Sequence, residues 1–315
     1  MARVITVGAA QLGPIQRADS RPTVVERLCA IMRQAHDKGC GLVVFPELAL
    51  TTFFPRWHME DQAEIDGWFE PEMPSDETRK LFELAAELKI AFHLGYAELT
   101  EEGGETHRYN SAALVDETGR IVAKYRKIHL PGHAEFDPER RFQHLEKRYF
   151  EIGNLGFPVT RAFDGIVGMC ICNDRRWPET YRVMGLQGVE MILLGYNTPT
   201  VNSQSDESAD LRGFHNHLAM QAGAYQNSSW VVGVAKAGNE DGHDMMGDSV
   251  IIAPTGEIVA QSRTLGDELI VADCDLDACT FGKETVFNFA AHRRIEHYGL
   301  ITERAGAIPP NPKER

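Results

Sequence analysis

The 315-residue sequence predicts an α/β protein in which two sheets pack against each other. Strand-like and helix-like segments alternate from the N-terminus, which is typical of parallel strands joined by right-handed helical crossovers. The apolar patterns further indicate roughly a dozen strands against about five helices. This proportion is high in strands for a single doubly wound sheet, so two packed sheets fit the pattern better.

The individual elements follow from apolar periodicity and turn residues. Residues 3–11 and 41–45 are expected as strands, joined by a helix that Asp19 or Ser20 caps. A second helix is expected over 75–89, with Ser75 as its cap, before a strand over 90–97. The later elements are expected as strands over 111–116, 120–127, 157–163, 166–172 and 190–195, helices from 178 and over 208–225, and strands over 230–235, 249–253, 257–261 and 269–273.

Two polar segments interrupt this regular pattern. Residues 128–156 contain no clear helix or strand signal, and a connection of this length inside a compact domain often carries function. Residues 199–213 form the most loop-like segment and are a candidate cover for a binding site. No linker composition and no internal repeat divide the chain. We therefore expect one domain over 1–305, with 306–315 as a C-terminal tail.

Composition restricts the partners. The formal net charge of −14 disfavours binding to nucleic acid or to an anionic membrane surface, because both would be repelled. The six cysteines are scattered through apparent strands and helices, which suits reduced thiols in the cytoplasm better than a disulfide framework. The apolar run at 4–10 is too short for a signal-peptide core or a membrane span. A small-molecule substrate is the remaining expectation.

A buried strand passes directly into charged residues at 166–178. Cys172 is the last apolar residue before Asn173, Asp174, Arg175 and Arg176. A thiol at such a strand-to-helix turn lies near a helix N-terminus, which favours the thiolate. Cysteines in apolar strands are nevertheless more often inert core residues, as is expected for Cys170, so this feature alone leaves both readings open.

Two further charged residues end apolar strands. Glu47 follows a strand directly, where it could act as a general base or simply be a solvated loop acid. Lys127 shares, by strand alternation, the face of Ile121, Ala123 and Tyr125, so its side chain is expected to point inward. A buried lysine is costly without an anionic partner, and a place beside a carboxylate or a developing oxyanion would satisfy it.

The sequence contains no convincing metal or nucleotide motif. His129 and His133 have the spacing of a helical zinc site, but Pro131 and Gly132 between them disfavour a helix. Gly-rich loops of the nucleotide-binding types are absent from the sequence. We therefore expect no metal and no cofactor.

Three strings together resemble the carbon–nitrogen hydrolase (nitrilase) superfamily. They are Val-Phe-Pro-Glu at 44–47, Tyr-Arg-Lys-Ile-His at 125–129 and Met-Cys-Ile-Cys-Asn-Asp at 169–174. The resemblance spans nearly the whole chain and implies a four-layer α-β-β-α sandwich that pairs into homodimers or homotetramers. It also implies that Glu47 is the base, Cys172 the nucleophile and Lys127 the group that stabilises the oxyanion.

Within that superfamily the sequence is most similar to the N-carbamoyl-D-amino acid amidohydrolases. The similarity lies at 47–58, 127–133, 142–150, 172–178 and 195–199. Nitrilases usually have Trp-Glu after the cysteine and aliphatic amidases Tyr-Asp, whereas this chain has Asn173-Asp174. The implied reaction converts an N-carbamoyl-D-amino acid to the D-amino acid, carbon dioxide and ammonia through a cysteine thioester. The alternatives are another ureido-acid or amine carbamoylase, an amidase, a nitrilase, or a non-catalytic scaffold protein.

The same resemblance assigns further residues to the site. Glu146 would be a second carboxylate that orients Lys127, although it could also be a surface acid. Arg175 and Arg176 would clamp the substrate carboxylate, because an arginine fork matches a carboxylate bidentately; without the resemblance they would be read as solvated turn residues. The remaining polar contacts would come from Asn173, His129, His144, Asn197 and Thr198. The preference for the D-enantiomer rests on the resemblance alone.

Overall fold

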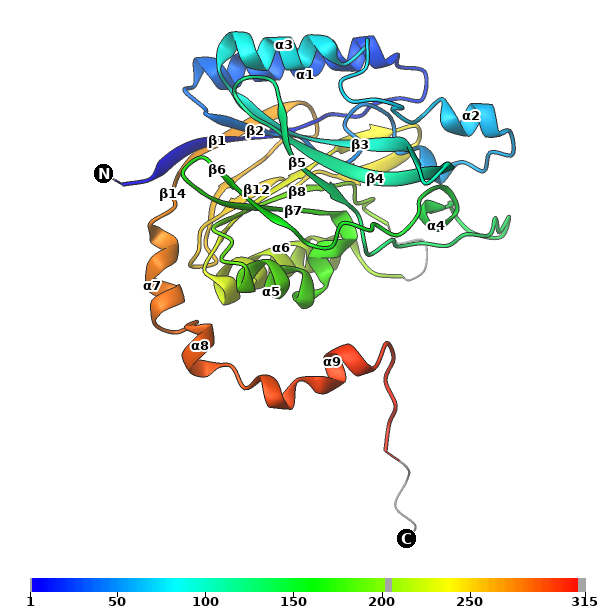
Figure 1. Cartoon of the computed structure of the whole chain (residues 1–315). Coiled ribbons are helices and arrows are strands. Elements are labelled where there is room, and N and C mark those ends of the chain that lie inside the picture. Colours follow the sequence, from blue (N-terminus) through cyan, green and yellow to red (C-terminus); the bar gives the residue numbers. More distant parts are fainter. Residues whose placement is uncertain (1, 202–205, 311–315) are drawn as a thin grey trace.

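The computed structural model describes residues 2–201 and 206–310, in which two six-stranded sheets pack face to face (Figure 1). The first sheet has the order β14 (Glu268–Asp275), β1 (Val4–Gln11), β2 (Leu42–Val44), β3 (Ala91–Glu102), β4 (Glu105–Val115) and β5 (Ile121–Arg126). The second has the order β13 (Ile258–Gln261), β12 (Val250–Ile252), β9 (Trp230–Ala235), β8 (Met191–Tyr196), β7 (Gly165–Ile171) and β6 (Val159–Ala162). A separate hairpin pairs β10 (Ala237–Glu240) with β11 (His243–Met246).

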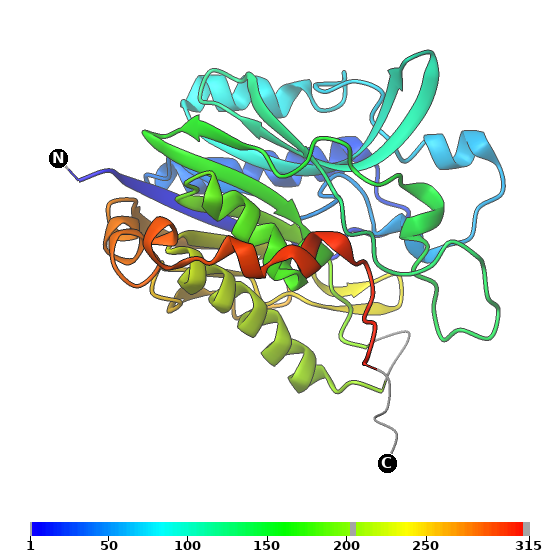
Figure 2. The ribbon, with the colours of Figure 1, turned by 60° about the horizontal axis from the view of Figure 1, so that its bottom comes forward.

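Helices cover the outer face of each sheet. The long helices α1 (Arg21–Asp37) and α3 (Arg79–Leu88) lie over the first sheet, and α5 (Pro178–Leu186) and α6 (Ala209–Asn227) lie over the second (Figures 1 and 2). This confirms the predicted four-layer α-β-β-α sandwich. The short elements are η1 (Phe54–Arg56), α2 (Gln62–Asp66), α4 (Glu146–Tyr149), η2 (Cys172–Arg176), α7 (Ala278–Glu284), α8 (Phe289–His292), η3 (Ile295–His297) and α9 (Gly299–Glu303).

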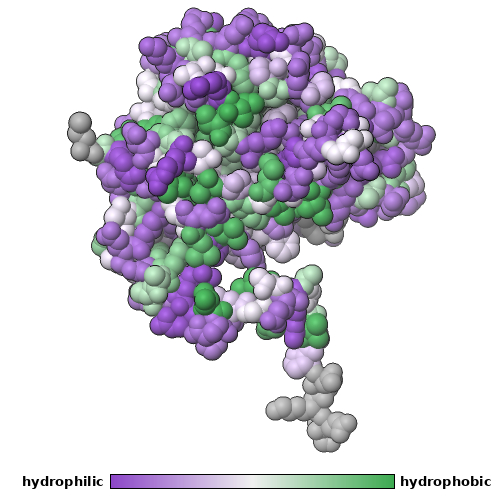
Figure 3. Space-filling model, in the orientation of Figure 1, coloured by the Kyte–Doolittle hydropathy of each residue, from purple (hydrophilic) through white to green (hydrophobic). Residues whose placement is uncertain are grey.

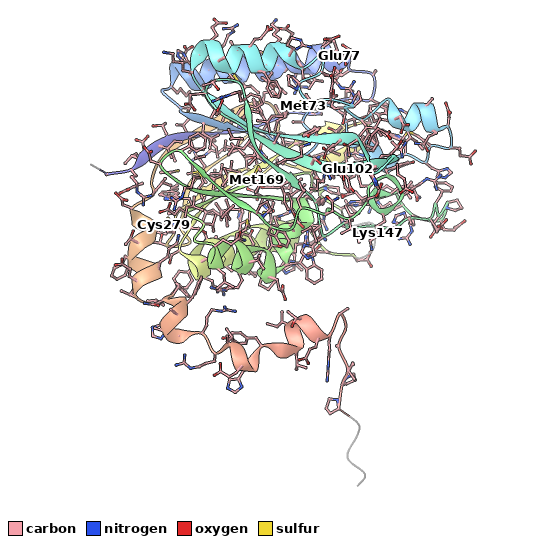
Figure 4. The ribbon with its side chains drawn as sticks, in the orientation of Figure 1. Met73, Glu77, Glu102, Lys147, Met169 and Cys279 are labelled. Atoms are coloured by element: carbon pink, nitrogen blue, oxygen red, sulfur yellow. The ribbon has the colours of Figure 1, made fainter. Side chains whose placement is uncertain are left out.

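The two sheets share a central apolar core. Met169 on β7 lies in this core between the sheets (Figure 4), together with the buried apolar residues of β8 and β9. Strands β1, β2 and β3 are parallel, and so are β7, β8 and β9, as the alternating pattern predicted. Because neighbouring parallel strands end at the same edge of their sheet, the segments that follow β7 and β8 lie side by side. The segment that follows β2 of the first sheet meets them there, through hydrogen bonds between Asn197 and Glu47.

The helix starts differ in how well the sequence predicted them. Helix α1 is capped by Ser20, whose side chain accepts a hydrogen bond from the Thr23 amide, so the second of the two predicted caps is the one used. The prediction of Ser75 as a cap is wrong, because α3 begins at Arg79. The Ser75 amide donates instead to Thr78 Oγ1 at 2.8 Å, and residues 75–78 form a turn before the helix.

Most of the strands and helices that the sequence analysis missed have polar sequences without apolar periodicity. Strands β3 and β4 continue beyond their predicted limits into a long hairpin, in which Glu98 receives hydrogen bonds from Ser111 and Arg126. The β10–β11 hairpin and the short helices after Asp277 also lack an apolar period. The C-terminal helices run along the outside of α5 (Figures 1 and 2), where Phe289 contacts Arg182.

Polar and apolar residues are unevenly distributed over the visible surface. In Figure 3 the face over α1 and α3 is mostly hydrophilic, whereas hydrophobic patches are visible lower on the molecule. Over residues 2–201 and 206–310, none of the helices combines the length and apolar content that a membrane crossing requires. Of the polar segment 199–213, residues 202–205 lie outside the described residues.

Candidate active site

The proposed catalytic residues follow strand ends from both sheets. Glu47 lies three residues after β2, Lys127 directly after β5, Cys172 directly after β7 and Asn197 directly after β8. Strands β2 and β5 belong to the first sheet and β7 and β8 to the second. The site therefore forms where the two sheets face each other.

Three buried charges form the centre of this site. Lys127 Nζ donates to Glu47 Oε1 at 2.7 Å and to Glu146 Oε2 at 2.6 Å, and all three side chains are 0% exposed. Burial disfavours the charged lysine, but Glu146 and Glu47 outweigh this effect and raise the pKa of Lys127. Burial likewise opposes ionisation of Glu146, yet Lys127 and His144 lower its pKa below the usual value. One lysine side chain is thus shared by two buried carboxyl groups.

The Glu47 carboxylate is held by neutral groups as well as by Lys127. Asn110 Nδ2 donates to Oε1 at 2.8 Å, and the Asn197 amide donates to Oε2 at 3.0 Å. Asn197 Nδ2 also donates to the Glu47 carbonyl at 2.9 Å. Oε1 thus accepts two hydrogen bonds and Oε2 one, which leaves Oε2 the greater remaining capacity to accept a proton. Asn110 was missed because a lone asparagine in a strand carries no distinctive sequence signal.

Two glycines allow the backbone of Glu47 to lie between the sheets. A Cβ atom on Gly95 of β3 would lie 2.5 Å from the Pro46 carbonyl oxygen, and one on Gly195 of β8 would lie 2.4 Å from the Glu47 amide nitrogen. Both distances are shorter than any real contact of a Cβ atom. Each sheet therefore contributes one glycine to the space around the strand end that carries Glu47.

Cys172 lies one step beyond the strand in which it was predicted. Strand β7 ends at Ile171, and Cys172 opens η2 with a φ of 48°, in the left-handed region. The Ile171 amide donates to Asp174 Oδ2 at 2.9 Å, which closes this turn. Burial raises the pKa of Cys172 and Glu47 adds to the effect, whereas Lys127 and Arg175 act in the opposite direction. Cys170 is fully buried in the core, as expected, and burial raises its pKa strongly.

Cys172 borders a cavity of about 170 Å³. The predicted residues that line it are His144, Cys172, Asn173, Arg176, Asn197 and Thr198. The sequence reasoning missed the other lining residues, which are Pro131, Gly132, Phe142, Pro199, Val201 and Arg212. All six come from the two polar segments at 128–156 and 199–213, and their apolar, glycine or loop-arginine character did not mark them individually as lining residues.

The residues around the cavity hold one another in place. His144 Nε2 lies 3.0 Å from Glu146 Oε1, so His144 connects the cavity wall to the buried charges. Arg212 donates from Nε to the Pro199 carbonyl at 2.9 Å and from Nη1 to Glu207 Oε2 at 2.9 Å. The Arg176 side chain is exposed, and no carboxylate in the described ranges lies within ion-pair distance of its guanidinium.

Two residues predicted to contact the substrate do not line the cavity. Arg175 is 1% exposed and its guanidinium is enclosed by other side chains. His129 places Nδ1 2.8 Å from Asp174 Oδ1, and its ring stacks on Trp177. The hydrogen bonds of the Arg175 guanidinium to Asn216, the Cys172 carbonyl and Thr198 account for its direction, whereas His129 is held by the buried Asp174. The sequence reasoning gave Asp174 no role of its own, although it is the buried acid that organises this turn.

No group of three or more His, Cys, Asp and Glu side chains that could hold a metal ion occurs in the part of the chain that the structure describes.

The fold brings Glu47 and Lys127 together near the strand end that carries Cys172. The carbon–nitrogen hydrolase family model matches residues 6–284, and the chain belongs to this family. It is accordingly an enzyme that hydrolyses carbon–nitrogen bonds of amides, as the sequence motifs predicted.

Two relatives with named activities match most of this chain. The N-carbamoylputrescine amidase of Solanum tuberosum is 30% identical over 318 residues, which cover 98% of each chain. The citrullinase of Francisella tularensis is 29% identical, covering 77% of this chain and 80% of its own.

Solved structures support the fold. A carbon–nitrogen hydrolase from Helicobacter pylori superposes with a TM-score of 0.82 at 23% identity, covering 96% of this chain and 99% of its own. An amidase from Nesterenkonia sp. gives 0.71 at 20% identity, covering 94% and 95%.

Proposed function

We propose that the protein hydrolyses N-carbamoyl-D-amino acids to the D-amino acid, carbon dioxide and ammonia. The observation that carries this proposal is the charge of the cavity beside Cys172. Among the described residues that line it, two are arginines and none is aspartate or glutamate. The protein as a whole carries a formal charge of −14, so an anionic substrate needs a local cation. The D configuration rests on the sequence motifs.

Arg176 is the best candidate for the group that binds the substrate carboxylate. Its side chain reaches the cavity and is exposed, and it makes no ion pair with the described residues. Arg212 is already paired with Glu207, and Arg175 is enclosed. A guanidinium fork can bind a carboxylate through two parallel hydrogen bonds, which fixes the orientation of the substrate as well as its charge.

The proposed reaction uses the buried cluster twice. Glu47 accepts the Cys172 proton while the sulfur attacks the ureido carbonyl, and the Lys127 ammonium faces the negative oxygen that develops. The terminal ureido nitrogen takes up a proton and leaves as ammonia, which produces a thioester on Cys172. Glu47 then removes a proton from water as the water attacks the thioester. The released N-carboxy amino acid breaks down to carbon dioxide and the free amino acid.

Hydrolysis of a carbamoyl amine is the second candidate, because the relative from Solanum tuberosum is an N-carbamoylputrescine amidase. Both candidates require the same attack on a ureido carbonyl. They differ at the far end of the substrate, which is a carboxylate in one and an ammonium in the other. An ammonium in this cavity would face Arg176 and Arg212 without an acidic partner among the lining residues, so the charge favours the amino acid.

The test measures ammonia release from N-carbamoyl-D-alanine, N-carbamoyl-L-alanine and N-carbamoylputrescine. We expect turnover of the D-alanine derivative and none in Cys172→Ala, whose fold is checked by circular dichroism. Arg176→Ala should raise KM for the D-alanine derivative roughly 10–100-fold, the value of a charge-assisted hydrogen bond or two, with little change in kcat. Arg182→Lys, on α5 outside the cavity, serves as the control.

Three results would each contradict part of the proposal. Faster hydrolysis of N-carbamoylputrescine than of either alanine derivative would favour the amine carbamoylase. An unchanged KM in Arg176→Ala would remove this arginine from carboxylate binding. Equal rates for the two alanine enantiomers would leave an N-carbamoyl amino acid hydrolase without the proposed stereochemical preference.

A further inference from the structure

Arg175 is enclosed directly behind the nucleophile. Its Nε donates to Asn216 Oδ1 at 2.9 Å, Nη1 to the Cys172 carbonyl oxygen at 2.6 Å and Nη2 to Thr198 Oγ1 at 2.8 Å. The guanidinium also lies 4.4 Å from the centre of the Tyr196 ring. All three nitrogens of the guanidinium therefore have partners, and none of them is directed at the substrate cavity.

The partners of Arg175 are all neutral. No carboxylate within residues 2–201 and 206–310 forms an ion pair with this guanidinium, which is 1% exposed. An arginine remains charged in proteins, and a buried charge without a counter-ion is costly. Nη1 lies 3.8 Å from Cys172 Sγ. A thiolate on Cys172 would supply the anion that the resting site lacks.

Lys127, another cation near the sulfur, differs from Arg175 because it has acidic partners. Lys127 forms hydrogen bonds with both Glu47 and Glu146, so its ammonium already has two acidic partners. The charged groups that act on the Cys172 thiol are Glu47, Lys127, Arg175, Glu146 and Arg176. Of these, Arg175 is the cation that is both buried and free of a carboxylate partner among the described residues.

Arg175 also holds the backbone at the nucleophile. Cys172 adopts a φ of 48°, which costs a residue with a side chain about 1 kcal/mol or more. The hydrogen bond from Arg175 to the Cys172 carbonyl and the bond from the Ile171 amide to Asp174 restrain this conformation from both sides. The same guanidinium thus restrains the turn and faces the sulfur.

We propose that Arg175 is a positioning residue for the nucleophile, which holds the Cys172 carbonyl in the left-handed turn and places an uncompensated positive charge beside the sulfur. It does not bind the carboxylate of the substrate. The inference rests on the proposed function only in taking Cys172 as the nucleophile, and it is independent of which ureido or amide compound is hydrolysed.

Asn216→Asp tests the charge without removing the guanidinium. The new carboxylate would lie in place of Asn216 Oδ1, 2.9 Å from Arg175 Nε, and would compensate the charge while keeping the hydrogen bond. We measure alkylation of Cys172 by iodoacetamide between pH 6 and 10, with Cys172→Ala as the blank for the other five cysteines. The expected result is alkylation about tenfold slower at pH 7 and a titration midpoint about one pH unit higher.

Kinetics separate positioning from substrate binding. In Asn216→Asp and in Arg175→Lys, kcat should fall about tenfold while KM stays within about threefold, for substrates with or without a carboxylate. Arg182→Lys is the matched control, because Arg182 lies on α5 and stacks on Phe289 at 4.2 Å, away from the sulfur. Its alkylation profile and kcat should equal those of the unmodified protein.

A wild-type alkylation profile in Asn216→Asp would overturn the inference, and so would a rise in KM confined to carboxylate-bearing substrates in Arg175→Lys. If the Arg175 variant does not fold, Asn216→Asp still decides the question. Slowed alkylation in a protein that leaves every N-carbamoyl amino acid intact would reject the proposed substrate and support the role of Arg175.

Discussion

Replacing Lys127 by methionine removes the ammonium that lies between two buried carboxylates. At 2.6 and 2.7 Å, and with an effective dielectric constant of about 20, each contact corresponds to roughly 6 kcal/mol of Coulomb energy before desolvation. The measured cost of leaving a buried charge without its partner is smaller, about 3–5 kcal/mol. We expect the free energy of unfolding of Lys127→Met to be lower by this amount at pH 8. This loss is a large part of the total free energy of unfolding of an ordinary domain.

The loss of stability in Lys127→Met should depend on pH. Lys127 lowers the pKa of Glu146, and without the lysine burial would raise that pKa above the value of about 4.3 in the unfolded chain. A carboxyl group with a raised folded-state pKa stabilises the fold below its unfolded pKa, and this contribution disappears as pH rises through the folded pKa. The deficit in Lys127→Met should therefore be smaller at pH 5 than at pH 8, by about 1 kcal/mol or more.

Urea unfolding at the two pH values measures this difference. Lys124→Met is the control, because Lys124 is part-exposed on β5, the strand that precedes Lys127, and Glu98 keeps its bonds from Arg126. This substitution should lower the free energy of unfolding by about 1 kcal/mol or less. The double variant with Glu146→Gln should recover part of the loss. A loss in free energy of unfolding below about 1 kcal/mol, equal at both pH values, would refute the reasoning. Such a result would mean that Glu47 and Glu146 do not become uncompensated buried charges when the lysine is removed.

Three further changes test the site and its support. Gly195→Ala should lower Tm by several degrees and reduce kcat, because its Cβ would meet the Glu47 amide; Gly213→Ala, with nothing within 4 Å, should do neither. Burial lowers the pKa of His93 to about 4. The free energy of unfolding should therefore fall by up to about 3 kcal/mol as pH drops from 6.5 towards 4. Urea unfolding of His93→Gln should show a flatter pH dependence. Asn110→Ala should lower kcat about tenfold with KM nearly unchanged; an unchanged kcat would exclude it from orienting the base.

Local sequence was sufficient for the framework of the fold. Apolar runs with turn residues at their ends predicted most strands of both sheets. A strand that is buried on both faces is almost continuously apolar, so it can be recognised from its own residues. Glu47, Lys127 and Cys172 were each found because a polar or reactive side chain interrupts or ends such a run. Polar strands, as in the hairpin after Glu98, were missed because their stabilising partners lie on neighbouring strands.

By itself, the sequence determined which residues could perform the chemistry and which strands deliver them. Only the tertiary structure decided which residues meet. Arg175 and Arg176 are adjacent and chemically identical, yet one is enclosed behind the sulfur and the other reaches the cavity. The physical reason lies in the hydrogen bonds that hold the Arg175 guanidinium, together with the close approach of two sheets at Gly95 and Gly195. The direction of such a side chain depends on contacts between distant segments, which spacing along the chain does not record.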